Sequence, residues 1–476
     1  MQQPQAQPAE KFSEKFTDHA VNGVNLTEQT ADFVAAHRTE DVRELALKSK
    51  RVDGLDLPLA LDQIAGWQIA CKKLPQWASC EGIIYPPHIS MEQCSSQFTA
   101  QYKSEIAQTL LTPAVTVRAR MSDSAESDNQ TTKSEPQLSD SGESDTQETK
   151  TGVRVTDSPE SDTLVARSSM VDLTGGFGVD FSYLARGFSQ ATYVERQRHL
   201  CDLAERNMAA LGLDQARIVC DDGVEYLRQM DPVDFIYLDP ARRDEHGSRT
   251  YAIEDCTPNV LELRDLLLAK SQCTLVKLSP MLDWRKAVAD FDGTVREVHI
   301  VATGNECKEL LLVLSQQVHE EPSAPRVFCV NDNQRIDYDS AAYTQGLRIG
   351  GKPLPETKNY LYEPNASIMK AGCFDLVEER FGVTQVGPSS HLFVSATPVA
   401  DFPGRGFAIE AIGGMNKKDI KRLLNGTKQA NIAVRNFPLT APQLRKKLKL
   451  ADGGPVYLFG TTMQGCDHVL LRTSKI

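Results

Sequence analysis

A glycine-rich turn between a predicted strand and a predicted helix constrains this 476-residue chain more than any other feature. The segment reads Val171-Asp-Leu-Thr-Gly-Gly-Phe-Gly-Val-Asp180. Gly175, Gly176 and Gly178 permit a tight turn and a close approach of the backbone to a ligand. The helix that follows points its amides and its positive end at that ligand. A dinucleotide-binding fingerprint would need a glycine at the sixth position from Gly176, where Phe181 stands, so NAD and FAD are disfavoured.

From residue 164 onward, short apolar runs alternate with helical patterns. Five runs read as strands, at 164–173, 191–195, 217–220, 235–239 and 274–279. This alternation predicts a parallel sheet that is covered by helices on both faces. Two further β-like runs, 295–303 and 309–314, are joined by a short turn around Gly304 and predict an antiparallel hairpin at the sheet edge.

Carboxylates stand at the ends of three successive predicted strands. Glu195 ends the second strand, a position suited to accepting both hydroxyls of a ribose. Asp222, beside Gly223, ends the third strand, where a carboxylate can accept from an adenine amine. Asp239 ends the fourth strand. Because the carboxyl ends of a doubly wound sheet open onto one crevice, the sequence predicts a ligand that contains a nucleoside.

Composition and patterning divide the chain into five regions. These are a helical region 1–118, an acidic insert 119–163, the alternating region 164–318, a small α+β connecting region 319–390 and an α+β region 391–476. The helical region carries an apolar stripe at four-residue spacing, typical of core packing, at Cys94, Phe98, Tyr102, Ile106 and Leu110. Residues 121–162 hold eleven acidic and three basic residues, a charge of −8, with few large apolar side chains. That composition predicts a disordered insert.

Several classes of protein are disfavoured by composition. The chain has no run of 18 apolar residues, so a membrane-spanning helix is not expected. Its first residues lack the apolar core of a secretory signal. The 11 cysteines are scattered and form no CxxC pair, so neither a disulfide scaffold nor a cysteine metal site is expected. These features favour a cytoplasmic chain that uses no metal.

The chain resembles class I S-adenosylmethionine-dependent methyltransferases, and more narrowly a bacterial group with a THUMP-like C-terminal domain. The resemblance lies in the segments DLTGGFGVD, YVER, CDLAERNMAALGL and IYLDPARRD, and continues through VKLSPMLDW, YEPNASIMKAGCFD and HLFVS into AVRNFPLTAPQLRKKLKL. It implies a Rossmann-like, doubly wound α/β sheet of seven strands that ends in an antiparallel hairpin. A helical N-terminal domain would precede this sheet, and an α+β THUMP-like domain would follow it.

The resemblance also implies S-adenosylmethionine as the cofactor. The residues lining its methionine half would be Asp172, Thr174, Gly175, Gly176 and Gly178. Glu195 would hold the ribose, and Asp222 and Gly223 would meet the adenine. Asp180 would either contact the methionine ammonium or cap the helix.

The segment Asp239-Pro240-Ala241-Arg242 lies where related amino-methyltransferases carry an acid or amide, two prolines and an aromatic residue. An exocyclic base nitrogen is a poor nucleophile because its lone pair is delocalised into the ring. The Asp239 carboxylate and the Pro240 carbonyl could accept both of its N–H bonds and orient the lone pair, so that catalysis would come from positioning. Ala241 and Arg242 depart from the pattern; Arg242 could stack on the base, hold a phosphate or be structural.

Methylation of a base carbon through a cysteine nucleophile is disfavoured. DPAR is similar to the DPPR segment of RNA 5-methyluridine enzymes, which need a cysteine just after the next strand. That place reads Leu278-Ser279-Pro280 and has no thiol.

Basic residues gather near the C-terminus. Between 415 and 450, ten bases stand against one acid, Asp419, in a region with expected helices near 417–424 and 441–448. The candidates for RNA contact are Lys417, Lys418, Lys421, Arg422, Arg435, Arg445, Lys446 and Lys447. Such a cluster favours contact with a phosphate backbone, although a solvated basic face is the alternative interpretation. THUMP domains are associated with RNA, so the resemblance implies tRNA or rRNA as the partner.

The sequence therefore predicts a cytoplasmic RNA methyltransferase that uses S-adenosylmethionine and modifies an exocyclic amine of a base in tRNA or rRNA. Two alternatives stay open. The altered DPAR segment is compatible with a non-catalytic RNA-binding protein that retains the fold. A methyltransferase that acts on a protein or a small molecule is the other.

Overall fold

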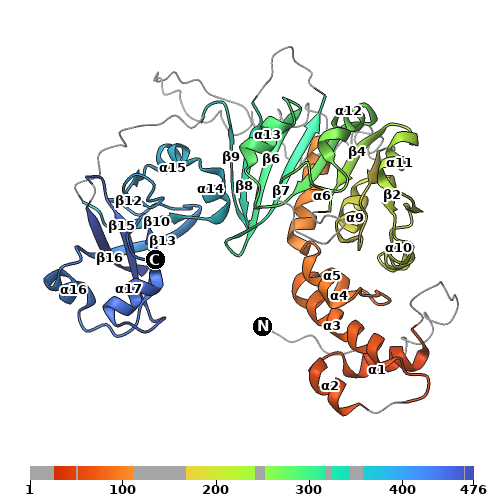
Figure 1. The fold of residues 1–476 in the computed structure, drawn as a ribbon, viewed down its shortest axis with the longest axis horizontal. Coiled ribbons are helices and arrows are strands. Elements are labelled where there is room, and N and C mark those ends of the chain that lie inside the picture. Colours follow the sequence, from red (N-terminus) through yellow and green to blue (C-terminus); the bar gives the residue numbers. More distant parts are fainter. Residues whose placement is uncertain are drawn as a thin grey trace, which may run out of the picture. The chain divides into compact units, whose positions relative to one another are not determined.

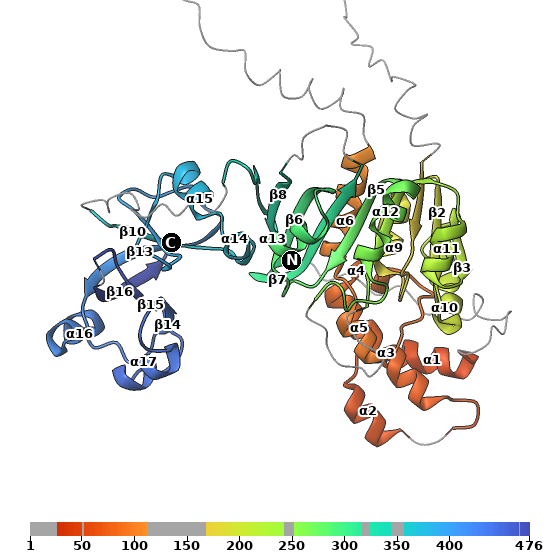
Figure 2. The ribbon, with the colours of Figure 1, turned by 45° about the horizontal axis from the view of Figure 1, so that its top comes forward.

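The computed structural model describes residues 26–49, 52–111, 168–241, 252–316, 324–343, 357–465 and 467–476. The acidic insert 119–163, predicted to be disordered, and the candidate residue Arg242 lie outside these ranges. The chain forms two compact units, Met1–Ile236 and Tyr237–Ile476, whose elements are drawn in Figures 1 and 2. Among the helices of the described ranges, none has the length and apolarity that a membrane crossing needs.

The described residues before 112 are helical, as the sequence predicts. The helices are α1 (Glu28–His37), α2 (Val42–Lys48), α3 (Leu57–Lys73), α4 (Pro75–Ser79), α5 (His88–Gln93) and α6 (Gln97–Leu111). The predicted apolar stripe runs along α6, where Tyr102 and Ile106 are buried, whereas Cys94 precedes the helix. α6 packs against α9 (Val179–Leu184), the helix that follows the glycine turn.

The larger sheet has nine strands in the order β3-β2-β1-β4-β5-β7-β6-β8-β9. The strands are β1 (Ser169–Asp172), β2 (Gln190–Glu195), β3 (Ala216–Cys220), β4 (Val233–Leu238), β5 (Ser271–Leu278), β6 (Val295–Thr303), β7 (Glu306–Ser315), β8 (Arg326–Asn331) and β9 (Gln334–Asp339). Its other helices are α10 (Arg198–Ala210), α11 (Gly223–Gln229), α12 (Val260–Lys270) and α13 (Trp284–Asp290). β1, β2 and β3 pair in parallel, and β7 runs antiparallel to both β5 and β6. The predicted alternation of strand and helix and the predicted hairpin are therefore confirmed.

Two expectations about this sheet are wrong. It has nine strands rather than seven, and the β6–β7 hairpin does not form its edge. β8 pairs in parallel with β6, and β9 returns antiparallel to β8. β8 joins the sheet because Val327, Cys329 and Val330 bury their side chains there. The region that begins at residue 319 therefore contributes two strands to the larger sheet.

A second sheet of seven strands, in the order β11-β12-β10-β13-β16-β15-β14, occupies the C-terminal residues. The strands are β10 (Tyr360–Pro364), β11 (Thr384–Gln385), β12 (Phe393–Ser395), β13 (Gly404–Gly413), β14 (Asn431–Arg435), β15 (Val456–Thr462) and β16 (His468–Lys475). The helices are α14 (Ala366–Ala371), α15 (Phe374–Phe381), α16 (Lys417–Leu424) and α17 (Ala441–Leu448). The expected helices near 417–424 and 441–448 are confirmed by α16 and α17.

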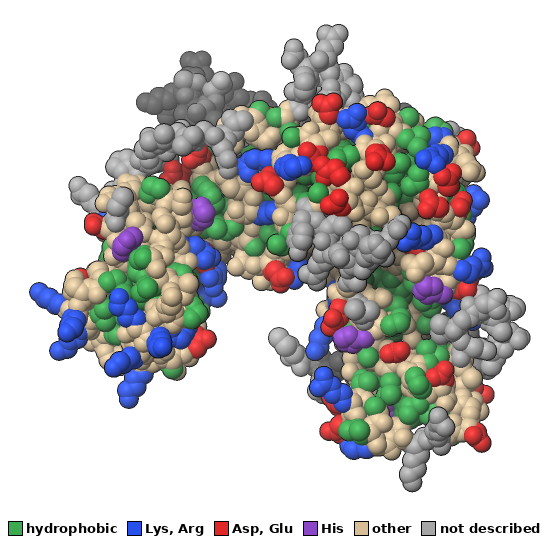
Figure 3. Space-filling view, viewed as in Figure 1, with side chains coloured by type: hydrophobic (Ala, Val, Ile, Leu, Met, Phe, Trp, Pro, Cys, Tyr) green, Lys and Arg blue, Asp and Glu red, His purple; other side chains and the backbone are tan. Residues whose placement is uncertain are grey.

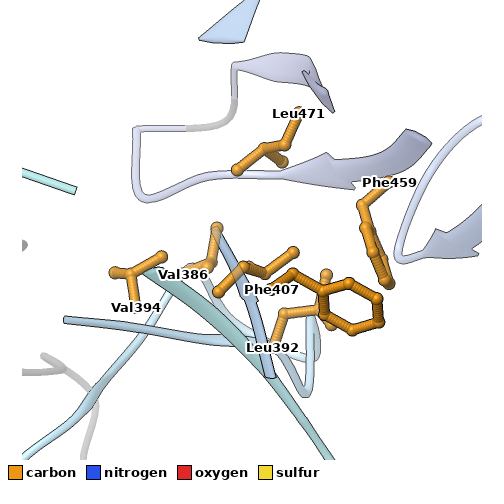
Figure 4. Close-up of a cluster of buried hydrophobic side chains, with 7 residues drawn as sticks. Val386, Leu392, Val394, Phe407, Phe459 and Leu471 are labelled. Atoms are coloured by element: carbon orange, nitrogen blue, oxygen red, sulfur yellow. The ribbon is translucent and has the colours of Figure 1, made fainter. Parts of the chain in front are cut away.

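One hydrophobic core joins residues on both sides of position 391, the expected start of the last region. Leu361 and Val386 precede that position, and Phe407, Phe459 and Leu471 follow it; all five are buried in one cluster (Figure 4). β11 and β12 also pair across position 391. Residues 357–390 and 391–476 therefore share a sheet and a core.

Candidate cofactor and acceptor sites

The glycine turn connects β1 to α9 and lies against β2. Gly176 and Gly178 have φ angles of 54° and 81°, which disfavour residues with a side chain. The amide of Gly175 donates to the carbonyl of Val194 at 2.9 Å. A Cβ atom at Gly175 would lie 2.2 Å from the ring of Tyr193. Glycine is therefore required at three positions, for conformation at two and for space at the third.

Asp172 supports this turn from the end of β1. Its side chain is buried, and its Oδ1 accepts from the amide of Thr174 at 3.0 Å. A carboxylate that accepts from the backbone two residues later stabilises a tight turn. The structure thus places both predicted residues at the base of the glycine turn.

Glu195 joins the end of β2 to the same turn. Its side chain is largely buried; Oε2 accepts from the amide of Gly176 at 3.0 Å and Oε1 from the amide of Gln197 at 2.9 Å. The hydroxyl of Tyr193 donates to the carbonyl of Gly176, and burial raises the pKa of Tyr193 well above its usual value, which keeps it a neutral donor. The carboxylate at this strand end is therefore held in one orientation by backbone amides.

Asp222 and Gly223 form the start of α11, after β3. Oδ1 of Asp222 accepts from the amides of Val224 at 2.9 Å and Glu225 at 3.2 Å, so this exposed residue caps the helix. A Cβ atom at Gly223 would lie 2.2 Å from the carbonyl oxygen of Leu173. The start of α11 therefore lies directly against the backbone of the glycine turn.

Asp180 contacts the N-terminal helices. Its Oδ1 lies 3.1 Å from Nζ of Lys103, and its Oδ2 accepts from the hydroxyl of Ser95 at 2.9 Å. The expectation that Asp180 could cap α9 is wrong, because Gly178 occupies the cap position and α9 has no side-chain cap.

Asp239, at the end of β4, is paired with Lys277, a residue that sequence reasoning missed. Nζ of Lys277, on β5, donates to Oδ2 of Asp239 at 2.6 Å. The Lys277 side chain is 16% exposed and that of Asp239 is 39% exposed. Pro240 is buried, and Ala241 exchanges two backbone hydrogen bonds with Thr257, of 2.8 and 2.9 Å. The segment after β4 is thus held by an ion pair and by a backbone bridge.

The predicted basic residues divide into two groups. Five lysines are exposed on α16 and α17, where basic side chains stand out in Figure 3: Lys417, Lys418, Lys421, Lys446 and Lys447. The arginines make contacts within the domain. Arg422 donates to the carbonyl of Ile412 at 2.7 Å, Arg435 to Oε1 of Glu363 at 2.8 Å, and Arg445 to the carbonyl of Ala430 at 3.0 Å. These contacts give the arginines a structural role, and the lysines, together with the exposed Arg422, present the charge on the surface.

Comparison with known proteins gives two family matches within the residues of the second sheet. Residues 360–403 match a family described as a ferredoxin-like domain, and residues 404–475 match a family described as THUMP domain-like. The boundary between the two matches is the start of β13. None of the curated proteins matches the chain.

The comparison with solved structures includes a match over nearly the whole chain. A "putative methyltransferase" from Porphyromonas gingivalis W83 is 28% identical, with a TM-score of 0.72, and the match covers 94% of this chain and 97% of that one. Two others match a smaller part. A SAM-dependent methyltransferase from Agrobacterium tumefaciens is 18% identical (TM-score 0.25, 32% of this chain, 56% of that one). An rRNA methylase from Streptococcus thermophilus is 15% identical (TM-score 0.24, 32% of this chain, 88% of that one).

The strand order, the full-length match and the C-terminal family agree with one another. β3-β2-β1-β4-β5-β7-β6 is the doubly wound arrangement with an antiparallel β7 that the resemblance implies. Apart from the two strands that follow the hairpin, β8 and β9, the predicted fold class is confirmed, and so is the predicted resemblance. The chain is thus related to methyltransferases and has a methyltransferase-type α/β sheet and a THUMP-like C-terminal domain.

Proposed function

We propose that this protein transfers a methyl group from S-adenosylmethionine to an exocyclic amine of a base in tRNA or rRNA. The observation that carries the proposal is the hydrogen bond from the amide of Gly176, in the glycine turn, to the carboxylate of Glu195. The match of the Porphyromonas gingivalis protein to 94% of this chain supports it. A glycine turn and a strand-end carboxylate are what a nucleoside-containing cofactor needs in a sheet of this type.

The residues around the turn fit S-adenosylmethionine. Gly175 and Gly223 let the backbone pack directly against Tyr193 and Leu173, where an added Cβ would clash, so the glycine turn and the start of α11 lie close together. Both oxygens of Glu195 are already oriented by amides and have lone pairs left for two ribose hydroxyls. We assign Asp222 and Gly223 to the adenine, and Asp172 and Thr174 to the methionine half. When bound, the cofactor supplies an electrophilic methyl group.

Asp239, Pro240 and Lys277 form the proposed acceptor site. Lys277 holds the Asp239 carboxylate in one orientation through its 2.6 Å contact. We assign the carboxylate of Asp239 and the carbonyl of Pro240 as acceptors for the two N–H bonds of the amine, which directs its lone pair. These groups contribute by positioning and need no covalent intermediate.

The exposed lysines of α16 and α17 are proposed to attract the RNA. A row of ammonium groups binds phosphates without reading sequence, so this surface would concentrate and orient RNA and leave base selection to the acceptor site. The match of residues 404–475 to a THUMP domain-like family supports this assignment.

Transfer of labelled methyl groups to bulk cellular RNA tests the proposal. The whole protein, S-adenosylmethionine with a tritiated methyl group and RNA from cells should give label that nuclease releases. Asp239→Ala should lower the rate by at least about 100-fold, whereas Asp255→Ala, at an exposed acid of the same unit, should leave it unchanged. Label that resists nuclease would favour a protein or small-molecule acceptor. RNA binding without cofactor binding would favour the non-catalytic alternative.

A further inference from the structure

We infer that Arg405 and Arg435 together bind one phosphate group of the RNA, at a site separate from the exposed lysines of α16 and α17. The inference rests on the proposed function, since it names a second and different contact for the same RNA. Arg405 lies on β13, and Arg435 is the last residue of β14. Both arginines contact the carboxylate of Glu363, on β10.

The three side chains lie on one face of the C-terminal sheet, next to its hydrophobic core. Glu363 pairs with Arg405 in the register of β10 and β13. Phe407, two positions after Arg405, is buried in the cluster of Figure 4, and side chains two positions apart on a strand share a face. Arg435 follows Ala433 by two positions, and Ala433 packs against the same cluster. The charged side chains therefore continue the face that carries the core.

The ion pair between β10 and β14 requires the sheet to curve. β13, β16 and β15 lie between these two strands. Neighbouring strands are about 4.8 Å apart, so β10 and β14 would be about 19 Å apart in a flat sheet. Nη2 of Arg435 nevertheless donates to Oε1 of Glu363 at 2.8 Å. The sheet therefore curves toward the face that carries the arginines, and side chains of distant strands meet there.

Two arginines share one carboxylate at this point, which leaves an excess of positive charge. The Glu363 side chain is 3% exposed, whereas those of Arg405 and Arg435 are 44% and 39% exposed. Two positive charges against one negative charge leave the cluster at +1. The other ion pairs in the described residues after 356 join one arginine to one acid: Arg422 to Asp419, Arg445 to Asp452 and Arg472 to Glu410. The second arginine at Glu363 is therefore available to an anion from outside.

Both guanidinium groups keep donors after their contacts within the domain. Arg405 donates to Oε2 of Glu363 through Nε, at 3.0 Å, and through Nη2, and its Nη1 makes no hydrogen bond within the described residues. Arg435 donates through Nη2 to Glu363 and through Nη1 to the carbonyl of Val434 at 3.2 Å. Each of these Nη atoms carries a second N–H. Nε of Arg435 is buried, so a ligand would meet the Nη groups.

The chemistry of this pair selects a phosphate. A planar guanidinium matches the oxygens of a phosphate with two parallel hydrogen bonds, and Glu363 fixes both guanidinium planes before the ligand arrives. A lysine ammonium is a point charge without such a preferred geometry. The arginine site would therefore fix one phosphate of the RNA, whereas the lysines attract many. RNA offers that phosphate either in its backbone or at its 5′ end.

Arginine-to-lysine substitution tests the inference, because it keeps the charge and removes the planar group. In the whole protein, Arg405→Lys and Arg435→Lys should each raise the Kd for bulk cellular RNA by about 10-fold. The slope of log affinity against log salt should stay as in wild type, since no charge is lost. The matched control is Arg326→Lys on β8. Arg326 donates to Asp337 through the same two nitrogens and lies over an aromatic ring, as Arg405 does, and its substitution should change neither quantity.

Removal of terminal phosphates from the RNA by phosphatase separates the two sources. If wild type then binds as weakly as the two arginine variants, the site holds the 5′ end. If wild type keeps its affinity and the variants remain about 10-fold weaker, the site holds a backbone phosphate. Either result supports the inference.

Other outcomes distinguish a failure of the inference from a failure of the proposed function. Wild-type affinity in both arginine variants, or an equal loss of affinity in Arg326→Lys, would overturn the inference and leave the proposed function standing. If the wild-type protein binds no cellular RNA, the proposed function itself is refuted. Arg405 and Arg435 lie on different strands, so one variant serves where the other does not fold.

Discussion

Gly175 lies at a position of the glycine turn that has no space for a side chain. A Cβ atom there would meet the Tyr193 ring at 2.2 Å, and Tyr193 is itself fully buried. We expect Gly175→Ala to cost about 1–3 kcal/mol of unfolding free energy, because overpacking forces its neighbours to move. It should also weaken S-adenosylhomocysteine binding.

Gly187→Ala is the matched control for that change. At Gly187 the nearest atom to an added Cβ is Cγ of the flexible Gln108 side chain, at 3.3 Å. Urea unfolding and calorimetry of both variants check the prediction. A Gly175→Ala protein that is as stable and binds as well as Gly187→Ala would contradict the geometry described for the turn.

Lys277 contributes to the acceptor site through Asp239. Lys277→Met should lower methyl transfer to RNA on the order of 10–100-fold, because a misoriented carboxylate no longer positions the amine. Binding of S-adenosylhomocysteine should be unchanged. Lys286→Met, which removes an exposed lysine that pairs with Asp290 on α13, should affect neither measurement. Full activity of Lys277→Met would show that Asp239 does not depend on this contact.

Lys277 and Lys103 also show where sequence reasoning about the site ends. The glycine turn, Glu195 and Asp222 are predictable because a strand, a turn and a helix start are close in sequence. Lys277 stands 38 residues after Asp239, and Lys103 stands 77 residues before Asp180. Nothing local indicates either pairing. The one signal for Lys277 is a charge within the apolar β-run 274–279, and the one signal for Lys103 is its place directly after Tyr102 of the apolar stripe.

At the scale of elements, the added strands β8 and β9 bury a histidine of β6. His299 is 3% exposed, its ring stacks on Phe328 of β8 with centroids 4.5 Å apart, and its Nε2 lies 3.2 Å from Glu297. Burial lowers the pKa of His299 below its usual 6.5, and this outweighs the hydrogen bond to Glu297, which raises it. The folded chain therefore prefers the neutral ring.

That preference predicts a loss of stability on mild acidification. Between the two pKa values the unfolded chain binds the proton and the folded chain does not, so the free energy of unfolding falls as the pH drops below about 7. The fall ends below the folded pKa. Urea unfolding at pH 7.5 and pH 5.5 should show a smaller difference for His299→Leu than for wild type. An identical difference in both proteins would exclude His299 as the source.

The sequence predicts strands β1 to β7 of the larger sheet but not the addition of β8 and β9. The runs that became β1 to β7 have the apolar pattern and the spacing of buried strands. β8 and β9 are ordinary hairpin strands whose sequence does not say which sheet they join. Pairing with β6 is decided by the apolar side chains that both strands bury, which is a property of the folded chain.

At the scale of the whole molecule, the exposed lysines of α16 and α17 belong to a domain whose sheet begins before residue 391, with β10. Removing residues 391–476 would take away β12 and β13, the two partners of β10, and expose Leu361 and Val386. Loss of RNA binding after that truncation would therefore not distinguish a lost surface from a lost fold. Point substitutions on α16 and α17 are the better test, because the side chains concerned are exposed.

Replacing Lys417, Lys418 and Lys421 together by glutamine should weaken RNA binding at physiological salt. Each lost phosphate contact lowers the slope of log affinity against log salt by about 0.7–0.9, so the slope should fall by about 2. The matched control replaces Lys48, Lys72 and Lys286 by glutamine; these are three exposed lysines outside the C-terminal sheet. The slope of the control should equal that of wild type. Equal slopes in the two triple variants would contradict a specific lysine surface.

The central claim is that the strand ends of the larger sheet hold an adenosine-containing cofactor, and titration of S-adenosylhomocysteine into the whole protein tests it most directly. Glu195→Gln keeps the shape of the side chain and replaces one acceptor oxygen with a donor. We predict one binding site per chain for wild type and a Kd raised by about 10-fold or more in Glu195→Gln. No heat of binding with wild type, or equal affinity in the two proteins, would contradict the account.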